Sequence, residues 1–262
     1  MNEYSFFLKK TLLEIKDYKF WGTFAINDIK IKYSRSKLGF YWSFVNTFIW
    51  ILALFVVFKS IFQNDDTSFL LYMSIGIIFF NFIESSISES STLLISNRNL
   101  LLNINISVFF FFLRNYYKNL LVFLMSFIIY LLQIIFIDVE FNKNIFYLPL
   151  TFIIFAQTVF ALTIIVGILC TRYRDLIHLT HVALRIFFII TPIFWMKSIL
   201  VEYKFVLDFN PFYYLLELIR NPLIGNYIEM KFLYVSLGIC LFSTAIAVFL
   251  LFITRNEIRH WL

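Results

Sequence analysis

Charged residues are scarce in this sequence, and so are glycine, proline and cysteine. Only 15% of the 262 residues are charged, and the chain holds 6 glycines, 4 prolines and 2 cysteines. A soluble domain carries about 25% charged and about 45–50% apolar residues. Here 61% of the residues are hydrophobic and the mean hydropathy is +0.84. A globule cannot hide so much apolar surface from water, so lipid must be the solvent for much of it.

Motifs of enzymatic chemistry are also missing from the sequence. No glycine begins a G-x-x-x-x-G-K-S/T loop that could cradle phosphates, and H-E-x-x-H, G-x-S-x-G and paired-cysteine zinc spacings are absent. We therefore predict that this chain is not an enzyme and binds no cofactor or metal of its own. Cys170 and Cys240 lie in apolar stretches, where we expect them to act as small buried hydrophobic residues.

Long apolar runs are abundant, and six of them could span the roughly 30 Å of a bilayer's hydrocarbon core as helices. These segments are Ser43–Phe62, Phe69–Ser88, Leu120–Ile137, Phe146–Cys170, Val182–Ile199 and Phe232–Ile253. We predict an all-α fold, a polytopic bundle of six transmembrane helices in a single domain, 1–262. Residues 1–42 would be cytoplasmic or interfacial, 43–254 the six-span bundle, and 255–262 a cytoplasmic tail.

Positive charge is unevenly distributed along the chain. Eight of the 22 Lys and Arg residues precede residue 43, and the first loop, 63–66, has none. With the N-terminus inside, 16 Lys and Arg fall on the cytoplasmic side and 6 on the other. We therefore predict that both termini are cytoplasmic. We therefore interpret the net charge of +6 as the excess of cytoplasmic Lys and Arg that orients a membrane protein. It does not indicate nucleic-acid binding.

The segment before the first span, Trp21–Lys37, is predicted to be an amphipathic helix in the headgroup plane. Its apolar face would carry Trp21, Phe24, Ala25, Ile29 and Tyr33. Three charged residues interrupt that face, namely Asp28, Lys32 and Arg35. The alternative is a plain basic anchor that only sets topology.

The segment 201–231, between the fifth and sixth predicted spans, is too long for a tight turn. Two Asn-Pro pairs bracket an apolar stretch of about ten residues, which is too short to span. We predict a re-entrant hairpin on the outer side, or alternatively a surface cap on the bundle. Its marker residues are Asn210, Pro211, Tyr213, Arg220 and Pro222.

Aromatic residues within the spans are candidates for lining a channel, because flat rings suit the apolar faces of sugars. The candidates are Phe44, Trp50, Tyr72, Phe79, Phe80 and Trp195. The alternative is that they face lipid or neighbouring helices.

Two polar clusters allow further hypotheses. Glu84 and Glu89, late in the second span, could relay protons, although a hydrated cytoplasmic end explains them equally. Asp175, His178 and His181 follow one another at steps of three residues and could hold a metal, or could simply form a polar entry to the fifth span.

Residues 27–42 carry a resemblance to a known family. Asp28, Tyr33, Ser36 and the Leu38-Gly39 pair stand at the positions of a signature found in the membrane subunits of bacterial polysaccharide ABC exporters. Further stretches resemble the same family in order along the chain: Asn97–Leu101, Arg172–Asp175, Asn210–Tyr213 and Arg220–Pro222. The resemblance thus covers nearly the whole chain.

The resemblance implies a homodimer in the bacterial cytoplasmic (inner) membrane, paired with two copies of a separate ATPase subunit that binds ATP and Mg. The implied substrate is a glycan linked to undecaprenyl pyrophosphate, most plausibly O-antigen. Leu38 and Gly39 would gate its entry, with Gly39 at positive φ in a sharp turn. Contacts to the ATPase are implied for Asn97, Arg98, Asn99, Leu100, Leu101, Arg172, Arg174 and Asp175.

Other functions stay open at this point. The same architecture could export teichoic acid, capsule or a small hydrophobic drug. A membrane-embedded lipid-modifying enzyme would need clustered acidic or histidine residues, for which Asp175, His178 and His181 are the only candidates. An assembly subunit would need no lumen at all.

Overall fold

A computed structural model places most of the chain. It describes residue 11 and the segments 13–62, 67–104, 106–137, 139–195, 204–255 and 257–262. The predicted loop at 63–66 and the last part of the predicted fifth span, 196–199, lie outside these residues.

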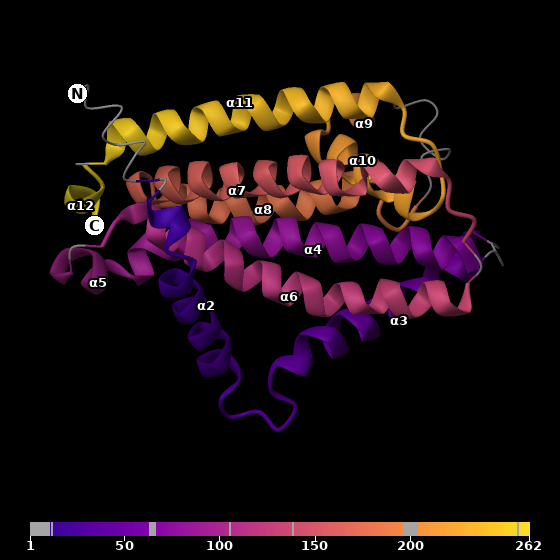
Figure 1. Ribbon diagram of the computed structural model, residues 1–262, viewed down its shortest axis with the longest axis horizontal. Helices are drawn as coiled ribbons and strands as arrows, with labels where there is room; N and C mark the ends of the chain where they lie inside the picture. Colours follow the sequence, from indigo (N-terminus) through magenta and orange to yellow (C-terminus); the bar gives the residue numbers. More distant parts are fainter. Residues whose placement is uncertain are drawn as a thin grey trace.

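Helices make up the described part of the chain, which contains no strand, as predicted for an all-α fold (Figure 1). The α-helices are α2 (Tyr18–Tyr33), α3 (Trp42–Phe62), α4 (Thr67–Ser96), α5 (Arg98–Asn103), α6 (Val108–Phe136), α7 (Leu148–Arg172), α8 (Asp175–Ile190), α9 (Lys204–Asp208), α10 (Pro211–Leu223), α11 (Met230–Thr254) and α12 (Ile258–Trp261). Two 3-10 helices, η1 (Gly39–Tyr41) and η2 (Lys143–Tyr147), precede α3 and α7.

Five helical segments are long and apolar enough to cross a membrane. They are Gly39–Ile61, Ser68–Ser96, Val108–Phe136, Lys143–Arg172 and Met230–Thr254. Each overlaps a predicted span, so the chain is a multi-pass membrane protein.

The predicted fifth span, Val182–Ile199, differs from the structure. Helix α8 starts seven residues earlier, at Asp175, and ends at Ile190. Its 16 residues extend about 24 Å, less than the roughly 30 Å of a hydrocarbon core. The helix stops there because Pro192 disfavours helical backbone at the residue before it. The count of six spans is therefore not confirmed by the described residues.

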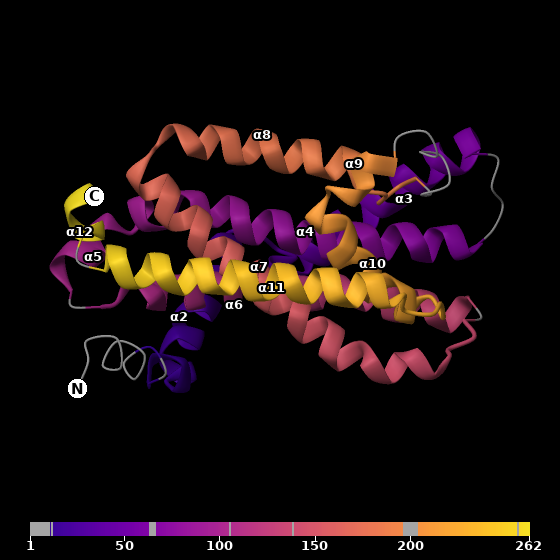
Figure 2. The same ribbon diagram turned by 90° about the horizontal axis from the view of Figure 1, so that it is seen from above.

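Helix α4 lies at the centre of the bundle, where it packs against α6, α7 and α8 (Figures 1 and 2). In its spanning stretch 72% of the residues are buried, against 11% in that of α3. It is also the least apolar of the five spanning helices. A helix enclosed by protein can hold polar side chains, whereas one facing lipid cannot. The central helix therefore carries more polar residues than the four spanning helices around it.

All four prolines lie near helix ends. Pro149 and Pro211 lie in the first turns of α7 and α10, Pro192 follows α8, and Pro222 lies in the last turn of α10. A first turn tolerates proline because the missing N–H would have no partner there. Asn210 caps α10 by accepting hydrogen bonds from the backbone N–H groups of Phe212 (3.0 Å) and Tyr213 (3.4 Å). The Asn-Pro pairs therefore mark helix ends, as predicted.

Helix α10 lies towards the end of the bundle opposite α5 and α12 (Figures 1 and 2). Every residue from Phe212 to Leu223 is buried, in contact with α4, α7 and α11. The segment is therefore enclosed by the bundle and does not form a cap on its surface. Whether it enters the membrane from one side stays a prediction.

Arg220 joins α10 to two other elements, although its side chain is completely buried. Its Nη1 donates to the carbonyl oxygen of Pro192 (2.8 Å) and to Glu217 Oε1 (2.7 Å). The guanidinium carbon lies 3.8 Å from the ring centroid of Tyr72 in α4, a cation–π contact. The Tyr72 hydroxyl donates to the same Pro192 oxygen (3.1 Å). These bonds form one polar junction between α4, α10 and the end of α8.

Gly76 makes room for this junction. A Cβ atom at Gly76 would lie 2.5 Å from Arg220 Nη2 and 3.1 Å from Ile193 Cγ2. Because Arg220 is held by three partners, its head group cannot swing away freely. The small residue in α4 is therefore required by the arginine in α10.

We predict that Gly76→Ala destabilises the chain by about 1–3 kcal/mol, the usual cost of overpacking. The measurement is the free energy of unfolding in detergent micelles titrated with SDS. Gly238→Ala is the matched control, because Gly238 also lies within a helix and nothing lies within 4 Å of its added Cβ. Equal effects of the two substitutions would contradict the role given to Gly76.

Candidate functional site

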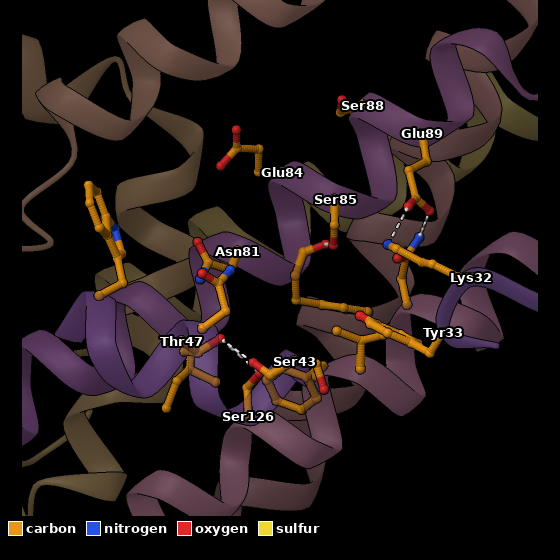
Figure 3. Close-up of a pocket in the computed structure, with 17 residues that line it drawn as sticks. Lys32, Tyr33, Ser43, Thr47, Asn81, Glu84, Ser85, Ser88, Glu89 and Ser126 are labelled. Atoms are coloured by element: carbon orange, nitrogen blue, oxygen red, sulfur yellow. Dashed lines mark hydrogen bonds and ion pairs between the residues drawn. The ribbon is translucent and has the colours of Figure 1, made fainter. Parts of the chain in front are cut away.

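A cavity of about 610 Å³ opens between α2, α3, α4 and α6, and Figure 3 shows its lining. Its size is that of an ordinary small-molecule site. The lining residues are mainly polar, although three of the four helices are spanning helices: Lys32, Tyr33, Ser43, Asn46, Thr47, Trp50, Ile78, Asn81, Phe82, Glu84, Ser85, Ser88, Glu89, Asn119, Val122, Phe123 and Ser126. A polar cavity beside spanning helices is the best candidate for a substrate site.

Helix α4 supplies the longest polar wall of the cavity. Asn81 is three and four residues from Glu84 and Ser85, and Ser85 is in turn three and four residues from Ser88 and Glu89. This spacing places all five on one helical face. Only the two glutamates were singled out from the sequence. Asn81, Ser85 and Ser88, at the same spacing, were the signal that would have located this wall.

Glu89 is the centre of an ion network at the α2 end of the cavity. Its carboxylate lies 2.7 Å from Lys118 Nζ and 3.8 Å from Lys32 Nζ. It also accepts a hydrogen bond from Asn119 Nδ2 (2.9 Å). The negative charge of Glu89 is therefore balanced by Lys32 of α2 and Lys118 of α6. Figure 3 shows the contact between Glu89 and Lys32.

Tyr33 lies at the same end of the cavity, at the last residue of α2. Burial, and after it the negative charge of Glu89, raise the pKa of the Tyr33 hydroxyl above its ordinary value. This hydroxyl consequently stays protonated at neutral pH and can donate a hydrogen bond to a ligand.

A second cavity of about 320 Å³ continues from Glu89 towards Asp28 and Asn97. Asp28 pairs with Arg114 in α6 through both carboxylate oxygens, with Nε to Oδ2 at 2.6 Å. Ala25 and Ile29 are buried on the same helix, whereas Phe24 is 37% exposed. Asp28 and Lys32 therefore do not interrupt an apolar face of α2 that contacts lipid headgroups. Their side chains point to ionic partners on α6 and α4.

Helix α2 also ends earlier than predicted. It stops at Tyr33, four residues before Lys37, and its buried face is Gly22, Ala25 and Ile29, which packs against α6. The predicted interfacial helix is thus docked on the bundle in this structure. Its position in a headgroup plane stays a prediction.

The corner between α2 and α3 projects away from the bundle (Figure 1). Gly39 has a φ of 54°, the left-handed region that favours glycine, so the predicted sharp turn at positive φ is confirmed. Leu38 is 47% exposed. Their gating role stays a prediction.

Of the six candidate channel aromatics, Trp50 alone lies in the lining of the large cavity. Phe79 packs edge-on against Phe123 and Phe155, and Phe80 packs against Phe212 and Phe188. These two rings belong to the core of the bundle and line neither the large cavity nor the second one. Their large rings made them channel candidates in the sequence, but in the structure these rings are surrounded by apolar neighbours.

The other three aromatic candidates have structural partners of their own. Tyr72 belongs to the Arg220 junction, and Trp195 donates from Nε1 to the carbonyl oxygen of Ile189 (3.1 Å). Phe44 stacks on Phe48 of the same helix. None of these three side chains lines the large cavity or the second one.

The two stretches expected to contact an ATPase lie at one end of the bundle, with α12 (Figures 1 and 2). In α5, Leu101 is fully buried, whereas Arg98, Asn99 and Leu100 are exposed. In the turn between α7 and α8, Arg172, Arg174 and Asp175 are exposed as well. Arg172 also lies 3.6 Å from Glu257 and 4.9 Å from the Trp261 ring centroid. The C-terminal helix thus adjoins one of the stretches.

The alternative metal site has no geometric support. The described residues contain no group of three or more His, Cys, Asp or Glu side chains placed to hold a metal ion. His181 Nδ1 instead lies 3.1 Å from Ser88 Oγ, while Asp175 and His178 are exposed. Cys170 and Cys240 are both buried, as predicted.

We predict that the Asp28–Arg114 pair contributes about 1–2 kcal/mol of coupling energy, because its side chains are 23% and 15% exposed and hydrogen bonds to charged groups are strong when shielded. The measurement is a double-mutant cycle with Asp28→Asn and Arg114→Gln, using unfolding free energies. The matched control is the Arg172–Glu257 pair, whose side chains are about half exposed and should couple by less than about 1 kcal/mol. A coupling energy at Asp28–Arg114 no larger than the control's would refute the prediction.

Comparison with known proteins places the fold in a family. Residues 22–224 match the ABC-2 type transporter family, a range that includes every residue lining the large cavity. The chain is also 22% identical over 171 residues to the O-antigen export system permease protein RfbA of Myxococcus xanthus. That similarity covers 65% of this chain and 66% of the relative. The match to most of the chain, together with the five spanning helices, shows that this protein belongs to the ABC-2 type transporter family.

Proposed function

We propose that this chain is the membrane subunit of an ATP-driven exporter that moves a lipid-linked polysaccharide across the bacterial cytoplasmic membrane. The similarity to an O-antigen export permease carries the proposal, and O-antigen on undecaprenyl pyrophosphate is the proposed substrate. The polar cavity beside α4 supports it, because a glycan needs hydrogen-bonding groups along its path. A small hydrophobic drug would leave those groups unpaired. Teichoic acid and capsule are equally polar and stay as alternatives.

The proposed assembly is a homodimer with two ATPase subunits, which carry ATP and Mg. Only 11% of the spanning stretch of α3 is buried, so that lipid or a second copy must cover its surface, and we propose the second copy. The exposed residues of α5 and of the α7–α8 turn, at one end of the bundle, would contact the ATPase from the cytoplasm. Closure of the ATPase would then move the two membrane subunits as rigid bodies.

We predict that the chain copurifies with a Walker-motif ATPase encoded beside it, and that lipid-linked glycan stimulates ATP turnover by the reconstituted complex. Turnover is measured with glycan added and withheld. The control replaces Arg98 and Arg174 with Ala, which should weaken the complex without unfolding the membrane subunit, since both side chains are exposed. A chain that binds no ATPase would refute the exporter function.

We predict that Gly39→Val lowers glycan-stimulated turnover more than Gly39→Asn does. A β-branched residue at a φ of 54° costs about 1–2 kcal/mol, whereas asparagine visits this region readily. Nothing lies within 4 Å of a Cβ at this position, so crowding is not the cause. Equal turnover of the two variants would contradict a role for the backbone turn.

A further inference from the structure

Three polar side chains of the large cavity have no partner among the described residues. Asn46 in α3 and Asn81 and Glu84 in α4 line the cavity, and none of them makes a hydrogen bond or ion pair there. Buried and half-buried polar groups in proteins are nearly always paired. Asn81 and Glu84 are half-buried, whereas Asn46 is exposed. The two half-buried groups at one cavity therefore indicate that its natural occupant supplies their partners.

Glu84 differs from Glu89, the other carboxylate of the cavity. Glu89 is held by Lys118, Lys32 and Asn119, whereas Glu84 stands apart from these bonds (Figure 3). Glu84 is also twelve residues from the end of α4 at Ser96, about 18 Å along the helix. It therefore lies well inside the spanning helix and carries an unbalanced negative charge into the cavity.

The surrounding groups define the chemistry of the occupant. A carboxylate accepts hydrogen bonds, and amides both donate and accept, so the occupant must offer hydroxyl or amine donors. Trp50 lies in the same lining and makes no ring–ring contact with the described residues. Its indole offers a flat apolar face. A carboxylate, amides and a free aromatic face together match a sugar ring, which has apolar C–H faces and a rim of hydroxyl groups.

We propose that this cavity binds one sugar residue within each subunit, and that Glu84 excludes acidic sugars from it. The inference rests on the proposed export function and adds a selectivity to it. A neutral or amino sugar donates hydroxyl or amine hydrogens to Glu84, while a uronic acid brings a second negative charge against it. Two like charges brought together in one cavity repel each other and disfavour binding.

The side of the cavity across from α4 is already arranged for such an occupant. Thr47 in α3 and Ser126 in α6 are joined by a hydrogen bond of 3.2 Å between their hydroxyls. That bond fixes the distance between the two helices beside Asn46 and Asn81. The ring of polar groups is therefore held by packing before any ligand binds, which reduces the entropy cost of binding.

The test uses the full chain in nanodiscs, titrated calorimetrically with octyl β-D-glucoside and octyl β-D-glucuronide at neutral pH. These probes differ in one carboxylate. We expect the wild type to bind the glucoside at least about tenfold more tightly. Glu84→Gln should bring the ratio close to one by improving glucuronide binding. Asn81→Ala should weaken both probes alike, because a neutral amide does not discriminate by charge.

Glu140→Gln is the matched control, since Glu140 is exposed and lies outside the cavity. It should keep the wild-type ratio of affinities. An unchanged ratio in Glu84→Gln, in protein that elutes as a single species on gel filtration, overturns the assignment, and so does a wild type that binds neither probe.

ATP turnover of the complex separates this inference from the proposed function. If glycan stimulates turnover but neither probe binds, the sugar site is wrong and the export function stands. If the probes bind with the expected ratio but no glycan stimulates turnover, the sugar site stands and the export function fails.

Discussion

The buried guanidinium group of Arg220 determines how the helices pack at the end of the bundle where α9 and α10 lie. Arg220 has no exposed surface, so its charge must be compensated by protein groups. Glu217 supplies the opposite charge, the Tyr72 ring supplies a negative face, and the carbonyl of Pro192 supplies an acceptor. That carbonyl is available because the helix has just ended. The break after α8, the small residue in α4 and the burial of α10 thus depend on one another.

The same electrostatic rule organises the other end of the molecule in a different way. There the charges lie at the edge of the spanning helices, and α2 is fixed to the bundle by Asp28–Arg114 and by the network around Glu89. Between the two ends lies the large cavity, where α4 presents a polar wall. A central helix can carry such a wall because α6, α7 and α8 shield it from lipid. The chain therefore combines a largely apolar core with one polar cavity beside its central helix.

Sequence reasoning succeeded where the signal is local. Asn210 and Pro211 start α10, because a capping side chain and a fixed φ act within one turn. Gly39 adopts positive φ for an equally local reason. It did not decide between the two readings of the aromatic residues, of which Phe79 and Phe80 follow the alternative and pack in the core. The sequence does not show which way each of the many phenylalanine rings points, because an apolar ring can lie against lipid, against a neighbouring helix or in a channel wall.

The helical class, five of the spanning segments, the helix ends marked by Asn-Pro pairs and the family resemblance follow from the sequence, because hydropathy, proline and short motifs are enough to predict them. Which polar residues meet depends on the packing of the helices. Glu84 and Glu89 are five residues apart and look alike in the sequence, yet one is neutralised and the other is not. Their difference comes from Lys32 and Lys118, which α2 and α6 bring to one carboxylate and not to the other. In a bundle surrounded by lipid, hydrophobic periodicity does not reveal the inner face of a helix. The spacing of Asn, Ser and Glu in the sequence indicates the polar wall of α4, but only the packing shows which residues lie opposite that wall.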